Sequence, residues 1–299
     1  MAALDDLSTT ITDIATRLGP SVVGIGSRLR GTGFVVADGA VATNAHNLRG
    51  DQVTIRFADG RVERGPVAGV DADGDLAVVS VDTSGAVPLE WESEEGVAVG
   101  RAVFGLGATA DGGPRVTFGL VSAVERAFRG PGGRRIEGSI EHTAPLAPGS
   151  SGGPLVDAGG RLVGVNTNRL GDAFYLALPA TAALRDRLGV LARGESVRRP
   201  RLGVAVAPPE LGRRLRRSVG LPDRDGLLVR GVEDGSPAAA AGIREGDLLV
   251  AAAGRPLTTA DDLHSVLSNA GLPLEVTIVR GAEELTVSAA PVSDASGEG

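Results

Sequence analysis

The sequence predicts a mainly β protein built from two domains. A chain of 299 residues usually forms two domains, so each half is expected to bury a core of its own. Short apolar runs recur along the chain with glycine-containing turns between them, which is typical of a barrel or a sandwich. Composition changes over residues 193–201, where arginine, glycine and proline cluster as they do in linkers.

The first half is expected to be a helix followed by short strands. Leucine and isoleucine recur at spacings of three and four between residues 4 and 18, which predicts an amphipathic helix that ends at Gly19 and Pro20. Strands are expected over 21–27, 31–36, 40–43, 52–57, 61–70, 76–79, 102–106, 115–125, 136–143, 154–156, 161–167 and 175–178, before a helix over 180–191.

The second half mixes strands and helices. Strands are expected over 202–207, 226–232, 247–252, 274–280 and 284–289, and helices over 210–219, 238–241 and 261–270. The chain therefore divides into a helix (1–19), a first domain (20–192), a linker (193–200), a second domain (201–292) and a disordered tail (293–299).

Composition excludes several functions. The sequence has no lysine and no cysteine, which rules out Schiff-base, P-loop-lysine and thiol chemistry. A net charge of −7 argues against nucleic-acid binding, and no apolar run is long enough to span a membrane. The acidic N-terminus lacks the features of a signal peptide, which predicts a cytoplasmic protein, or a periplasmic or extracellular one if the N-terminus was trimmed.

A possible nucleophile is Ser151, which lies in the segment Gly-Ser-Ser-Gly-Gly over 149–153. A serine hydroxyl needs a base and an orienting acid to become reactive. Of the three histidines, His46 directly follows a predicted strand, and it is followed in order by Asp75 and Ser151. This order is that of chymotrypsin-like proteases. His142, nine residues before Ser151, is interpreted as a strand residue.

Several motifs resemble those of the HtrA/Deg serine proteases. They are Gly-Thr-Gly-Phe-Val-Val from residue 31, Thr-Asn-Ala-His ending at 46, Asp-Leu-Ala-Val-Val from 75 and Pro-Gly-Ser-Ser-Gly-Gly-Pro-Leu-Val from 148. The resemblance covers about residues 20–180, with the motifs in order. It implies a chymotrypsin-like double β-barrel and an endopeptidase of protein quality control and the stress response, which forms trimers and needs no metal or cofactor.

The resemblance also implies roles for single residues. His46 is expected to be the general base, Asp75 its orienting acid and Ser151 the nucleophile, with the N–H groups of Gly149 and Ser151 as the oxyanion hole. An apolar S1 pocket, formed by Pro145, Leu146 and Thr167, predicts cleavage after small aliphatic residues.

Residues 201–292 resemble the small α+β PDZ domain that follows the protease in this family. The segment Gly-Ser-Pro-Ala-Ala-Ala-Ala-Gly-Ile-Arg-Glu-Gly-Asp over 235–247 carries the match. By this resemblance, the N–H groups of Leu202, Gly203 and Val204 bind a peptide C-terminus, and Leu263 and Leu267 line the groove.

The sequence departs from the family in three places. Asn47 stands where the family has valine, Ser150 stands where it has asparagine, and Glu-His-Thr-Ala over 141–144 replaces a common Gln-Thr-Asp-Ala. These departures leave a second hypothesis open, in which a latent protease shell accompanies a PDZ domain that only binds peptides.

Overall fold

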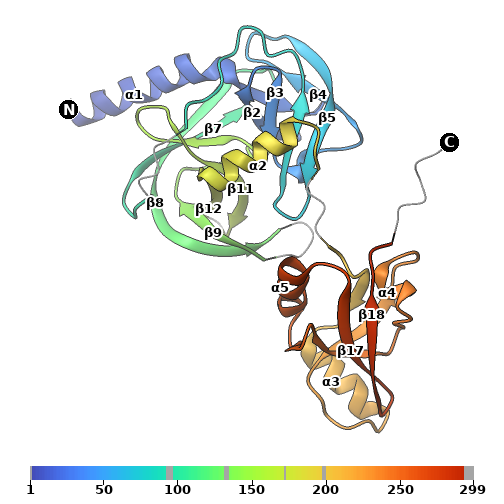
Figure 1. Cartoon of the computed structure of the whole chain (residues 1–299). Coiled ribbons are helices and arrows are strands. Elements are labelled where there is room, and N and C mark those ends of the chain that lie inside the picture. Colours follow the sequence, from blue (N-terminus) through green and yellow to red (C-terminus); the bar gives the residue numbers. More distant parts are fainter. Residues whose placement is uncertain (1, 92–96, 131–134, 172, 197–199, 293–299) are drawn as a thin grey trace, which may run out of the picture. The chain divides into compact units, whose positions relative to one another are not determined.

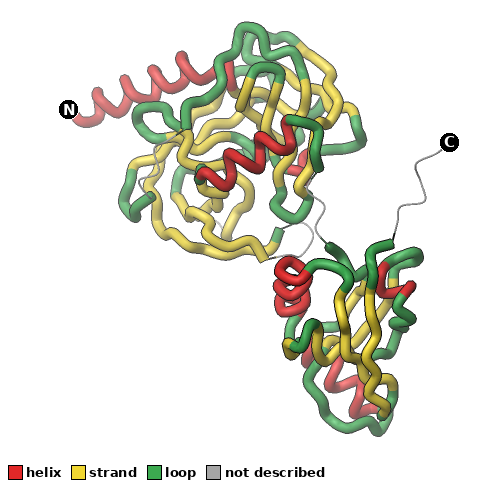
Figure 2. The backbone as a smooth tube through the Cα atoms, viewed as in Figure 1, coloured by secondary structure: helices red, strands yellow, loops and turns green. Residues whose placement is uncertain are grey.

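The computed structural model describes residues 2–91, 97–130, 135–171, 173–196 and 200–292. Strands make up most of its regular structure, as Figure 2 shows, which confirms the mainly β class. The chain separates into two compact units, Met1–Arg198 and Arg199–Gly299. The finer boundaries expected from the sequence remain predictions. The tail over 293–299 and part of the expected linker, 197–199, lie outside the described residues.

The first unit contains two closed antiparallel barrels, as the sequence predicts. Their strand orders are β1-β2-β3-β6-β5-β4 and β10-β11-β12-β9-β8-β7. The first barrel consists of β1 (Val22–Ile25), β2 (Gly31–Ala37), β3 (Ala40–Thr43), β4 (Gln52–Arg56), β5 (Val62–Asp71) and β6 (Leu76–Ser80). The second consists of β7 (Ala102–Ala108), β8 (Pro114–Arg129), β9 (Arg135–His142), β10 (Pro154–Val156), β11 (Leu162–Leu170) and β12 (Phe174–Pro179).

Each barrel is filled by β-branched and leucine side chains. Val35, Val41 and Val79 belong to the buried cluster of the first barrel, and Val121 and Leu155 belong to that of the second. A third buried cluster contains residues of both barrels, so it joins them within the first unit. The site described below lies where residues of the two barrels meet.

Two helices complete the first unit. In α1 (Ala2–Leu18), Ile14 is fully buried against Phe104 and Leu106 of the second barrel, whereas Leu4 is 70% exposed. Helix α2 (Ala182–Ala192) follows the last strand of the second barrel but packs on β5 and β6 of the first (Figure 1). The leucines of α2 belong to the cluster that joins the barrels. Short 3-10 turns cover Gly19–Ser21 (η1) and Ala45–Asn47 (η2).

The second unit is a sheet with helices, in the order β13-β14-β15-β17-β18, with β16 paired to β15. Its strands are β13 (Val204–Val206), β14 (Leu227–Val232), β15 (Leu248–Ala252), β16 (Arg255–Pro256), β17 (Leu274–Arg280) and β18 (Glu283–Ala289). Its helices are α3 (Pro209–Ser218), α4 (Pro237–Ala240) and α5 (Ala260–Ala270). The sequence did not predict β16, because two residues are too short to show a periodicity.

Among the described residues, no helix combines the length and the apolar character that crossing a membrane requires.

Candidate active site

A histidine and a buried aspartate form a hydrogen-bonded pair at the edge of the first barrel. His46 lies in η2, directly after β3, and its Nδ1 is 2.8 and 3.0 Å from the two carboxylate oxygens of Asp75. The backbone N–H of His46 also donates to Asp75, over 3.1 Å. The side chain of His46 is 34% exposed and that of Asp75 only 2%. The carboxylate therefore holds one side of the imidazole while the ring remains accessible.

Asp75 is held by its backbone and by neighbours from both barrels. Its φ of 54° lies in the left-handed region, which aspartate tolerates better than most residues. Asn44 donates its amide N–H to the carbonyl of Asp75 over 2.9 Å. Thr167 in β11 donates its hydroxyl to Asp75 Oδ2 over 2.9 Å. The bonds from Thr167 and His46 offset the cost of burying the carboxylate and fix its direction, whereas Asn44 holds the main chain.

Ser151 lies in the loop between β9 and β10 of the second barrel. Its hydroxyl donates to the backbone carbonyl of Thr167 over 3.1 Å. Within the described part of the chain, this hydroxyl makes no hydrogen bond to His46. Thr167 thus links the two halves of the predicted triad, because its side chain contacts Asp75 and its carbonyl contacts Ser151.

Three carbonyls of the loop around Ser151 have donors. Thr32 of β2 donates its hydroxyl to the Gly149 carbonyl over 2.7 Å and its backbone N–H to the Ser151 carbonyl over 2.9 Å. The Ser150 carbonyl accepts from the N–H of Gly153 over 3.0 Å. The N–H groups of Gly149 and Ser151 donate to no acceptor among the residues that the structure describes. At residues 149 and 151 the loop therefore offers N–H donors, while the carbonyls are already bonded.

The turn before Ser151 needs its glycine. The N–H of Ser150 donates to the Ala147 carbonyl over 3.1 Å, and this closes a turn with Pro148 and Gly149 at its centre. The φ of Gly149 is +89°, the value that the third position of a type II turn requires. A residue with a Cβ would strain this conformation, so glycine at 149 maintains the shape of the loop.

The three residues predicted to line an S1 pocket differ in their surroundings. Pro145 is exposed and Leu146 is half-buried. A Cβ at Gly105 of β7 would lie 2.9 Å from the Leu146 side chain, so that side chain packs closely over β7. Thr167 is buried, its hydroxyl is bonded to Asp75, and its carbonyl accepts the hydroxyl of Ser151.

His142 is confirmed as a strand residue, at the end of β9. It is fully buried, its Nε2 lies 3.0 Å from Asn166 Oδ1, and its ring stacks on Tyr175 with the centroids 5.8 Å apart. Burial lowers the pKa of His142 from 6.5 to about 4, while the hydrogen bond with Asn166 acts in the opposite direction. His142 is therefore a neutral imidazole at neutral pH.

The predicted peptide-binding residues of the second unit fall into two groups. Leu202, Gly203 and Val204 lie at the start of β13, and the carbonyls of the first two accept backbone N–H groups over 2.9 Å. In the described part of the chain, the N–H groups of Leu202 and Gly203 have no acceptor. Leu263 and Leu267 are only 4% and 3% exposed in the core of this unit, so they lie beneath the surface of α5.

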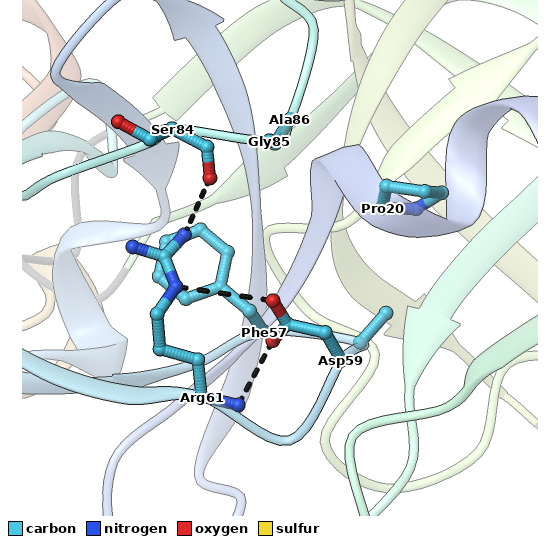
Figure 3. Close-up of a pocket in the computed structure, with 8 residues that line it drawn as sticks. Pro20, Phe57, Asp59, Arg61, Ser84, Gly85 and Ala86 are labelled. Atoms are coloured by element: carbon cyan, nitrogen blue, oxygen red, sulfur yellow. Dashed lines mark hydrogen bonds and ion pairs between the residues drawn. The ribbon is translucent and has the colours of Figure 1, made fainter.

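A separate pocket of about 310 Å³ lies on the first barrel (Figure 3). Arg61 at its wall donates to the carbonyls of Asp82 and Ser84 over 3.1 and 2.9 Å and lies over the ring of Phe57. No residue of the predicted triad lines this pocket. Among the described residues, no group of three or more His, Asp or Glu side chains is arranged to hold a metal ion.

Two closed barrels, with a histidine–aspartate pair on one and a glycine-flanked serine on the other, define a chymotrypsin-like serine protease. Comparison with known proteins agrees with this class. Residues 31–165 match the trypsin-like peptidase domain, and residues 228–280 match the PDZ domain.

Individual relatives are similar along most of the chain. A Synechocystis protein named as the serine protease HhoA is 33% identical over 87% of this chain and 69% of its own length. A Pseudomonas fluorescens protein, described by its name as a periplasmic DegP-like serine endoprotease, is 31% identical over 88% of this chain and 57% of its own length. The solved structure of the HtrA-type protease AlgW with a tripeptide is 27% identical, with a TM-score of 0.61 over 95% of this chain and 99% of that one.

The chain belongs to the HtrA/Deg family of serine proteases and is a serine endopeptidase with a PDZ domain after the protease domain. The hypothesis of a non-proteolytic peptide-binding protein is not favoured, because the named relatives are proteases.

Proposed function

We propose that His46, Asp75 and Ser151 form the catalytic relay. The observation that carries this proposal is the pair of short contacts between His46 Nδ1 and the buried carboxylate of Asp75. This arrangement leaves Nε2 as the basic nitrogen of the ring. Rotation of the Ser151 side chain away from the Thr167 carbonyl directs its hydroxyl to that nitrogen.

The reaction then proceeds by acyl transfer. Ser151 Oγ attacks the carbonyl carbon of the scissile peptide bond as its proton passes to His46, and Asp75 stabilises the resulting imidazolium. The N–H groups of Gly149 and Ser151, which have no acceptor among the described residues, are assigned to the developing oxyanion. His46 gives its proton to the leaving amine, and a water molecule activated by the same imidazole hydrolyses the ester and frees Ser151.

The proposed substrates are unfolded or misfolded proteins, cleaved after small aliphatic residues. Pro145 and Leu146 support an apolar S1 pocket, because neither places a charge beside the nucleophile loop. At the second unit, the free N–H groups of Leu202 and Gly203 support capture of a peptide carboxylate, with the peptide added as a strand beside β13. The tripeptide named with the AlgW structure supports peptide binding in this family.

A fluorophosphonate probe tests the proposed relay. Such a probe phosphonylates, with loss of fluoride, only a serine that is activated by a base and served by an oxyanion hole. We expect one adduct per chain, located on Ser151 by mass spectrometry of the digested protein. Labelling of a different serine, or a chain that stays unlabelled under conditions in which trypsin reacts completely, would contradict the proposal.

We also propose that the protein forms a homotrimer, as the resemblance to the family implies, with α1 as a contact. In support, Leu4 of α1 is 70% exposed, and Phe118 on β8, the strand against which α1 packs, is 38% exposed. Light scattering is expected to give three times the chain mass of 30.1 kDa. A monomeric mass at micromolar concentration would contradict this prediction.

For location, we propose the periplasm in preference to the cytoplasm. The name of the similar Pseudomonas fluorescens protein supports this choice.

A further inference from the structure

Asn47, one of the three departures from the family pattern, contacts the nucleophile loop directly. It follows His46 in η2 and is 2% exposed. Its amide Nδ2 donates to the backbone carbonyl of Ser151 over 2.9 Å and lies 3.0 Å from the hydroxyl of Thr43. Valine at this position would offer no donor. The departure therefore adds a bond between the two barrels at the site of catalysis.

The neighbouring residues leave space for this amide. A Cβ on Gly31 would lie 2.2 Å from both Cγ and Nδ2 of Asn47, so the two residues are sterically complementary. The Thr43 hydroxyl donates in turn to the Thr32 carbonyl over 2.7 Å. The amide is thus enclosed by β2 and β3 of the first barrel, and its position is fixed.

The bond adds to an existing attachment. The Ser151 carbonyl already accepts the backbone N–H of Thr32 over 2.9 Å, so two donors of the first barrel hold one carbonyl of the nucleophile. Because His46 belongs to the same barrel, these donors set where the nucleophile lies relative to its base. An error of about 1 Å in such a spacing costs roughly 100-fold in rate.

We propose that Asn47 is a positioning residue, which ties the main chain of Ser151 to the barrel that carries His46. The inference rests on Ser151 being the nucleophile, as proposed above. Asn47 acts on the geometry of attack and not on substrate binding. Its loss should therefore lower kcat and the rate of acylation and leave KM unchanged.

The test separates hydrogen bonding from packing. Asn47→Ala removes the amide and leaves a space, and Gly31→Ala places a methyl group in that space. We expect Asn47→Ala to lower kcat for a peptide substrate and the rate of fluorophosphonate labelling about tenfold, with KM changed less than twofold. The double variant Gly31→Ala/Asn47→Ala should regain thermal stability but not kcat. A double variant with wild-type kcat would overturn the inference, because packing alone would then explain Asn47.

A matched control removes a comparable bond elsewhere in the first unit. Ser21 is 2% exposed and donates its hydroxyl to the Val87 carbonyl over 2.5 Å. Ser21→Ala should lower thermal stability without lowering kcat or the labelling rate. If wild type is labelled on Ser151 and Asn47→Ala is labelled equally fast, the inference fails while the proposed function stands. An unlabelled wild type overturns the proposed function and this inference with it.

Discussion

Replacing Ser151 with alanine is expected to lower kcat about 10⁶-fold, and replacing Asp75 with asparagine about 10⁴-fold. Alanine removes the nucleophile outright. Asparagine keeps the shape of residue 75 but replaces one carboxylate oxygen with a donor, where His46 Nδ1 and the hydroxyl of Thr167 now donate. The imidazole of His46 would then carry its proton on Nε2 instead of Nδ1. Residue 75 would also lack the negative charge that stabilises the imidazolium. Initial rates on an unfolded protein such as casein measure both effects.

The two losses of activity are expected in variants that remain folded. Both variants should retain the fold, because Ser151 is a loop residue and asparagine also tolerates the left-handed backbone that residue 75 adopts. Circular dichroism and the light-scattering mass serve as controls. An Asp75→Asn variant with wild-type kcat would show that the contact with His46 is structural. A Ser151→Ala variant that still cleaves casein would exclude Ser151 as the nucleophile.

Acidification is expected to destabilise the first unit by about 3 kcal/mol through His142 alone. Burial lowers the pKa of His142 in the folded state from 6.5 to about 4. Below pH 6.5 the unfolded chain binds a proton that the folded chain does not yet bind, so stability falls as pH falls. The loss begins near pH 6.5 and is complete near pH 4, where the folded state is protonated as well.

Urea unfolding at pH 7 and pH 5 measures this loss. Trp91, the single tryptophan of the chain, lies in the first unit and reports its unfolding by fluorescence. Between these pH values, wild type should lose about 2 kcal/mol more than His142→Gln, because groups that titrate in both proteins cancel in the difference. Equal losses in the two proteins would show that His142 does not contribute.

The sequence predicted the fold well where a local pattern determines the structure. The buried strand β6 is a continuous apolar run after Asp75, and β17 (Leu274–Arg280) has the predicted bounds. The long strand β8 (Pro114–Arg129) was expected to end at 125, since its last four residues lack a clear alternation. Local patterns thus located strands more reliably than their ends.

The contacts that complete the site were beyond the reach of sequence reasoning. Thr167 was predicted to line a pocket, but its hydroxyl contacts Asp75, 92 positions away in the chain. Thr32, which holds the carbonyls of Gly149 and Ser151, was not singled out at all. Such bonds depend on how the two barrels pack together, and threonine occurs in many strands with no such role. The candidate residues His46, Asp75 and Ser151 could be named from the sequence because their motifs are local and the order of the motifs is specific.

The Ser151 hydroxyl, which is bonded to the Thr167 carbonyl, must rotate before it can react, and the rate of this rotation can be compared with the rate of turnover. Leaving the Thr167 carbonyl breaks one hydrogen bond, which costs about 1 kcal/mol. Side-chain rotations take picoseconds to nanoseconds, whereas enzymes typically turn over about 1 to 10³ times per second. The hydroxyl therefore leaves the Thr167 carbonyl at least about a hundred thousand times within each catalytic cycle. This rotation is therefore too fast to limit turnover, and a slow switch of this protease would need a movement other than the rotation of this side chain.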